Sequence, residues 1–85
     1  MIQGIEYVID RKLIVDEEGN DVTAGPSTRH RVRAVGPGEA IHAFADSAGG
    51  VILGTVKPRG LGAAALMEVR QRVYRLTAVP VPDRT

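Results

Sequence analysis

The sequence predicts a small two-layer α+β domain, with an antiparallel or mixed sheet of three to four strands and one or two helices on one face. Three patterns indicate this: apolar residues alternate with polar ones over 4–16, a helical pattern fills the stretch between Gly36 and Gly50, and a short apolar run follows at 51–56. The chain has 85 residues, which is room for one domain. We therefore expect a single domain over 1–79 and an extended tail over 80–85.

Composition narrows the class of protein. The hydrophobic fraction is 44% and the charged fraction 25%, which excludes a disordered polyelectrolyte and a histone-like chain. The chain has no cysteine, which excludes a disulfide scaffold, thiol catalysis and a thiolate zinc site. Its longest apolar run, Ala63 to Met67, is far too short to span a bilayer. We expect a soluble cytoplasmic protein with no membrane partner.

The first half of the predicted sheet comes from 4–16, 21–24 and 29–35. Between the first two segments, Glu17 to Asn20 reads as a turn, because Gly and Asn adopt a positive φ at little cost. Gly25, Pro26 and Ser27 then end the second segment. In the third, Arg29, Arg31 and Arg33 alternate with His30 and Val32, which predicts one cationic and solvated strand face.

The clearest helix follows Gly36. Pro37 suits a first helical turn, Glu39 complements the positive end of the helix, and Gly49-Gly50 supplies the stop. Apolar residues at 41, 44, 45 and 48 form one stripe. With the strands on either side, this helix makes a strand–helix–strand unit that is compatible with a crossover connection.

The region from 61 to 79 admits two interpretations. Alanines at 63–65 and apolar residues at roughly helical spacing favour a second helix. The β-branched residues and Tyr74 within 69–79 equally allow a strand. If the segment 40–45 were also extended, the fold would be a small all-β barrel, and we keep that as the alternative. The expected core is Ile5, Tyr7, Ile9, Leu13, Val15, Val32, Ile41, Phe44, Val51, Leu53, Leu66, Val69 and Val73.

Charge is unevenly distributed along the chain. Residues 1–28 hold two basic and six acidic side chains, for a net charge of −4, whereas residues 29–85 hold nine basic and four acidic ones, for +5. This polarity predicts either a molecule with opposite charged faces or, after folding, an evenly mixed surface. Partner-binding candidates are the charged residues Arg29, Arg31, Arg33, Lys57, Arg59, Glu17 and Glu18.

The sequence contains only weak motifs for ligand binding, metal binding or catalysis. The basic loop 57–62 lacks the P-loop pattern, but if a helix followed it, Lys57, Arg59, Gly60 and Gly62 could hold an anion. The acidic turn 16–21 lacks the pattern of a calcium loop, and two histidines without a carboxylate motif are a poor catalytic signal. We assign no catalytic residue, no metal ligand and no cofactor.

The resulting hypothesis is a small non-catalytic interaction module: an accessory, adaptor or inhibitor protein that docks on a larger protein or nucleoprotein complex. An inhibitor encoded by a mobile element is one version of it. Two alternatives stay open. One is a nucleic-acid-binding protein that uses the arginine strand 29–33 and the loop 57–62, and the other is an anion- or nucleotide-dependent enzyme. A homodimer is also compatible with so small a chain.

Overall fold

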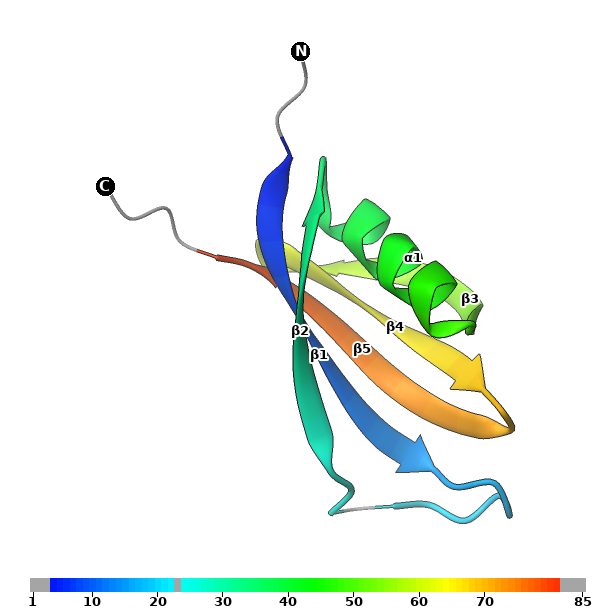
Figure 1. Ribbon diagram of the computed structural model, residues 1–85. Helices are drawn as coiled ribbons and strands as arrows, with labels where there is room; N and C mark the ends of the chain where they lie inside the picture. The colour runs from blue at the N-terminus through cyan, green and yellow to red at the C-terminus, as the bar shows by residue number, and fades with distance from the viewer. Residues whose placement is uncertain (1–3, 23, 82–85) are drawn as a thin grey trace.

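A five-stranded antiparallel sheet carries one helix on one face (Figure 1). The computed structural model describes residues 4–22 and 24–81. In chain order the elements are β1 (Ile5–Val15), β2 (Ser27–Ala34), α1 (Pro37–Ala48), β3 (Val51–Arg59), β4 (Gly62–Val69) and β5 (Arg72–Pro80). The α+β prediction is confirmed, with one more strand than expected.

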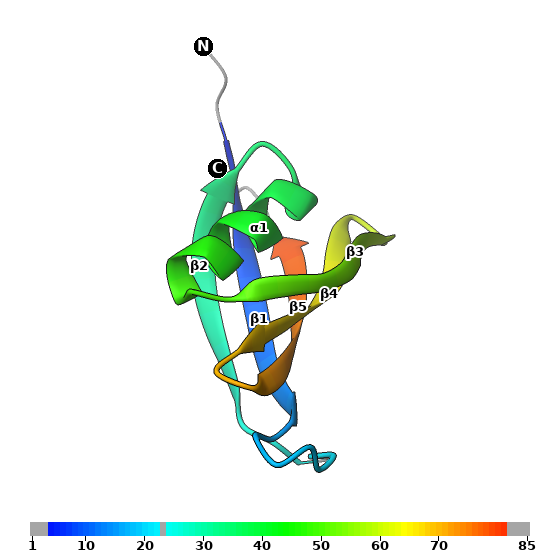
Figure 2. The same cartoon turned by 90° about the vertical axis from the view of Figure 1, so that its right-hand side faces the viewer.

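Strand order in the sheet is β2-β1-β5-β4-β3, and every neighbouring pair is antiparallel. The edge strands β2 and β3 therefore run in the same direction, and α1 connects them by crossing three intervening strands. The sheet is strongly twisted, so that β3 crosses the direction of β1 at a steep angle in Figure 2. It is not closed, and the barrel alternative is wrong.

Helix α1 begins and ends where its sequence signals lie. Pro37 occupies the first turn, and Gly49 caps the C-terminus in the left-handed region at φ 73°. The buried face of the helix comprises Ala40, Ile41, Phe44 and Ala45. It packs against all five strands, and Figure 2 shows it lying across the sheet.

The second helix expected after residue 61 is wrong. Residues 62–69 and 72–80 form the hairpin β4–β5, so the strand interpretation of 69–79 holds from Arg72 onward. Ala63, Ala65 and Met67 alternate toward α1 and are buried, at 3%, 7% and 0% exposure. Two small side chains in this row let the helix lie close to the sheet, and this packing outweighs the helix propensity of alanine.

The core partly matches the prediction. Tyr7, Ile9, Ile41 and Phe44 are buried as expected, and Val32 and Val69 pack against them. Four expected core residues are instead exposed: Ile5, Val51, Leu53 and Leu66. The buried residues missing from the prediction are Ala40, Ala45, Ala63, Ala65, Met67, Leu76 and Ala78.

Two remaining expectations concern the chain ends and the segment 21–24. Asp21 forms only an isolated bridge to Val15, so no strand of the sheet lies there within the described residues. Pro80 is the last residue of β5, and 82–85 of the predicted tail lie outside the described residues. In the part of the chain that the structure describes, no helix is long and apolar enough to cross a bilayer.

Candidate functional site

The sheet face opposite α1 is not covered by any element of the described chain (Figures 1 and 2). Side chains alternate across a strand, so the register places on this face the residues that do not point toward α1. We call it the uncovered face and define it by Glu6, Val8, Asp10, Lys12, Arg29, Arg31, Arg33, Leu53, Lys57, Ala64, Leu66, Glu68, Arg75, Thr77 and Val79.

Cations outnumber acids on the uncovered face. Its definition includes six basic and three acidic residues. Lys12 of β1 stands directly opposite Arg75 of β5 in the register, and neither forms an ion pair among the described residues. Like charges directly opposite each other on neighbouring strands are destabilising. This pair therefore provides two cations in the middle of the sheet that an external anion would stabilise.

Aliphatic side chains lie between these cations. Val79 is 53% exposed, Leu66 39% and Leu53 37%. Leu53 and Leu66 are directly opposite each other and line a hollow of about 410 Å³ together with Lys57 and Arg75. A second hollow of about 340 Å³ is lined by Val8, Val79, Arg29 and Arg31, among others. Apolar area surrounded by charge is typical of a protein-binding surface.

The arginine row of β2 is confirmed as one face of an edge strand, with all three residues exposed. Arg31 Nη1 forms an ion pair with Glu6 Oε2 at 3.1 Å, and Arg33 Nη1 donates to the Gly4 carbonyl at 2.9 Å. Arg29 stands opposite Asp10, whose Oδ1 is buried and has no hydrogen-bond partner among the described residues. Two of the three arginines are thus held by neighbours, Arg31 by Glu6 of β1 and Arg33 by Gly4 just before it.

Lys57 and Arg59 do not join that row. They lie on β3, at the other edge of the sheet from β2. The helix N-terminus on which the predicted anion site depended is absent, because Gly60 and Leu61 form a two-residue turn that leads into β4. Gly62 is buried, and a Cβ there would collide with the Ala78 carbonyl. The loop is therefore a hairpin end with a basic side chain on β3.

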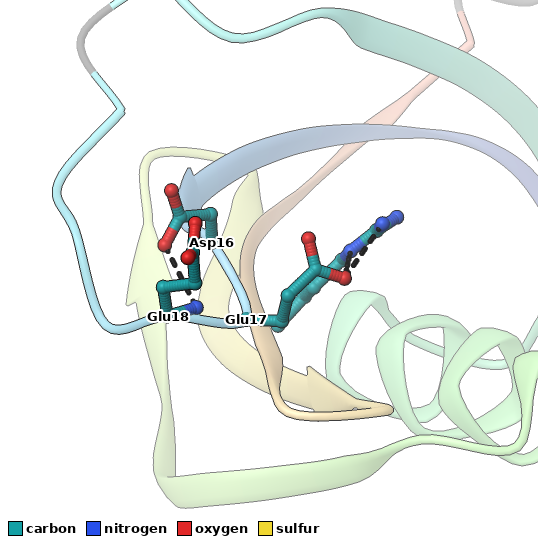
Figure 3. A network of polar contacts seen from close by, with 4 residues as sticks. Asp16, Glu17 and Glu18 are labelled. Atoms are coloured by element: carbon teal, nitrogen blue, oxygen red, sulfur yellow. Dashed lines mark hydrogen bonds and ion pairs between the residues drawn. The ribbon is translucent and has the colours of Figure 1, made fainter.

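The acidic turn folds on Asp16. Its Oδ1 accepts hydrogen bonds from the backbone N–H of Glu18 at 3.0 Å and of Asn20 at 2.8 Å. The hydrogen bond from Asn20 is the main cause that lowers the pKa of Asp16 below its ordinary value. Glu17 does not stay free, because its Oε2 pairs with Arg72 Nη2 at 2.9 Å (Figure 3). Glu18 is exposed.

Both ion pairs join the acidic first part of the chain to the basic remainder. Folding therefore neutralises some of the charge polarity of the sequence. Both pairs are solvent-exposed, so each contributes little to stability. The uncovered face keeps more basic than acidic residues after these pairs are formed.

The residues that define the uncovered face include no aromatic side chain and no group that could hold a metal ion. The chain has three aromatic residues, and Tyr7, Phe44 and Tyr74 all belong to the helix side of the sheet or to the helix itself. His30 is also on that side, with its ring centroid 4.8 Å from that of Phe44. Within the described residues, no group of three acidic or histidine side chains could hold a metal ion.

The sequence prediction missed Lys12 and Arg75 as site residues. Both were visible as charges, but only the pairing of β1 with β5 brings them together. Residues 12 and 75 are far apart in the chain, and Arg75 was expected on a helix or an unassigned strand. Comparison with protein families, characterised proteins and solved structures finds no match for this chain.

Proposed function

We propose that the protein is a non-catalytic interaction module whose uncovered face docks on an acidic surface of a larger protein. One observation supports this most strongly. Lys12 and Arg75 are directly opposite each other on neighbouring strands, beside exposed aliphatic residues, on the sheet face that no element of the described chain covers. A partner that places carboxylates against these cations relieves their repulsion and buries the aliphatic area in the same contact.

A protein partner fits this face better than a single-stranded nucleic acid. Proteins that bind single strands stack bases on aromatic side chains, and the uncovered face has none. Its exposed leucines and valine instead supply apolar contact area. Arginine is suited to carboxylates because its planar fork binds them through two parallel hydrogen bonds.

The edge strands add a constraint on how the partner approaches. β3 carries Gly54 at φ 73° and Pro58 near its end, and its pairing with β4 shifts between Leu53 and Lys57. Bulges, Pro and Lys are typical protections of an edge strand against added strands. The edge formed by β3 is therefore protected, and the proposed contact is with the uncovered face.

Site-specific photo-crosslinking in the native host tests the proposal. A benzophenone amino acid replaces Val79 on the uncovered face or, as the matched control, Ala43 on the exposed side of α1. We expect one protein adduct from position 79, none from position 43, and loss of the adduct in an Arg29→Glu/Arg75→Glu background. The adduct should withstand nuclease, and the captured protein, once purified, should bind the wild-type chain and not the charge-reversed variant.

Three results would overturn it. An adduct that disappears after nuclease treatment would favour the nucleic-acid alternative. An adduct consisting only of a second copy of this chain would make the uncovered face a dimer interface. Equal adducts from positions 79 and 43 would show that the face has no selectivity.

A further inference from the structure

A second concave site lies on the helix side of the sheet, beyond the C-terminus of α1. It has a volume of about 420 Å³ and is lined by Arg11, Glu17, Ala48, Val69, Arg70, Arg72 and Tyr74. We call it the Tyr74 pocket. It shares no residue with the uncovered face, and none of its arginines belongs to the predicted site. Its volume is within the range of small-molecule pockets.

The three guanidinium groups come from separate parts of the fold and two of them are held in place. Arg11 of β1 stacks over the Tyr74 ring, with its Cζ 4.7 Å from the centroid. Arg72 donates from Nε and Nη2 to Glu17 Oε2, at 3.1 and 2.9 Å. The pKa of Arg72 is raised by its hydrogen bond to Tyr74 first and by Glu17 second. Arg11 is therefore held against the Tyr74 ring, and Arg72 is held by Glu17.

Arg70 is presented by an unfavourable backbone. It and Gln71 form the β4–β5 turn with φ of 51° and 68°, a two-residue turn that favours Asn-Gly. An arginine in the left-handed region costs free energy that Asn or Gly would not. Arg70 nevertheless lines the Tyr74 pocket together with Arg11 and Arg72. The turn therefore places a third cation at this position at a cost in folding free energy.

From this arrangement we infer that the Tyr74 pocket binds a small phosphate monoester. Three arginines and one glutamate leave the pocket with a positive excess, and a phosphate dianion offers several acceptor oxygens that more than one guanidinium group can share. A carboxylate has only two such oxygens and one charge. The volume exceeds that of a phosphate group, and Ala48 and Val69 supply apolar surface for the organic part of the ligand.

Titration of the wild-type chain with phenyl phosphate, followed by amide NMR, tests this inference. We expect saturable shifts at Arg11, Val69, Arg70 and Tyr74, and a Kd about tenfold lower than for benzenesulfonate, which has the same ring and a single charge. Inorganic phosphate should shift the same amides more weakly, because it lacks the ring. The residues of the uncovered face should not respond.

Substitutions separate binding from folding. Arg11→Gln and Arg70→Asn should each weaken phenyl phosphate about tenfold, which is the loss expected for one charge-assisted contact. Arg70→Asn should at the same time raise the Tm, because Asn suits its turn position, so loss of binding cannot be ascribed to unfolding. The matched control Arg59→Gln, at the far hairpin, should bind like the wild type.

The inference is overturned if the shifts are linear and do not saturate, if benzenesulfonate binds as well as phenyl phosphate, or if Arg70→Asn binds normally. Shifts centred on the arginines of β2 would also overturn it, because they would show that the anion binds to the uncovered face instead. Each outcome concerns the Tyr74 pocket alone and leaves the docking proposal for the uncovered face to its own test.

Discussion

Lys12 and Arg75 stand directly opposite each other in the pairing of β1 with β5, on the sheet face that α1 does not cover. No acidic side chain within the described residues forms an ion pair with either. Two cations held in this relationship repel each other, so their interaction disfavours the isolated fold and favours a state in which an external acid lies between them.

Reversing one charge of this pair should stabilise the protein. Arg75→Glu converts the repulsion into an attraction with Lys12, and we expect the free energy of unfolding to rise by about 1 kcal/mol. Urea denaturation at low salt measures this, and added salt should shrink the gain. Arg59→Glu is the control, with a change near zero expected. A loss of stability in Arg75→Glu would show that the arginine is held by the fold itself.

The β4–β5 turn should also be improvable. Replacing Arg70-Gln71 by Asn-Gly removes two unfavourable left-handed residues. We expect the free energy of unfolding to rise by about 1–2 kcal/mol. Each kcal/mol raises the Tm of a domain of this size by about 4–8 °C. Thermal unfolding followed by circular dichroism gives the answer. An unchanged Tm would mean that the arginine and glutamine side chains compensate the backbone cost.

Two leucines on adjacent strands should respond very differently to the same substitution. Leu76 is fully buried beneath α1, so Leu76→Ala should cost about 2–5 kcal/mol. Leu66 is 39% exposed on the uncovered face, and Leu66→Ala should cost only about 1 kcal/mol. Chemical denaturation of the two variants measures the difference. Equal losses would contradict the assignment of Leu66 to the uncovered face.

Acid should remove the contribution of Asp16. Its pKa is lowered in the folded state, chiefly by the backbone hydrogen bond from Asn20, so its stabilisation is present above the ordinary value of 3.8 and is lost as the pH falls through the folded-state pKa. Asp16→Ala should therefore lower the Tm at neutral pH, and the difference from wild type should shrink below pH 3.8. Glu18→Ala, at an exposed neighbouring side chain, is the control and should change little. A difference that persists undiminished in acid would refute the charge-dependent role.

The sequence predicted best those elements whose signals depend only on neighbouring residues. Pro37 and Gly49 act through their own backbone, and α1 was therefore predicted well. The alanines at 63 and 65 have helix propensity but pack as small side chains beneath α1, a requirement of the tertiary structure that no local pattern contains. On β3, Ile52 and not its neighbours faces the core, and Gly54 then interrupts the alternation.

The residues of the candidate site also fall into those that a local pattern predicts and those that only the tertiary structure brings together. The arginines of β2 share one strand, so their alternation alone placed them together. Lys12 and Arg75 meet only through strand pairing, and the arginines of the Tyr74 pocket come from β1, a hairpin turn and β5. Such groupings depend on the strand order β2-β1-β5-β4-β3, which a single sequence does not specify.

Association kinetics with the partner captured at position 79 measure whether the uncovered face docks on an acidic protein surface. Charge reversal at Arg29 and Arg75 should slow association strongly at low salt and less at physiological salt, because exposed charges mainly steer the encounter. Reversal at Arg31 and Arg33, which belong to the same face, should likewise slow association more than it speeds dissociation. Arg70→Glu, on the helix side of the sheet, is the control and should leave the rate closer to that of the wild type. Unchanged association rates at low salt after reversal of the arginines at 29, 31, 33 and 75 would rule out docking through the uncovered face.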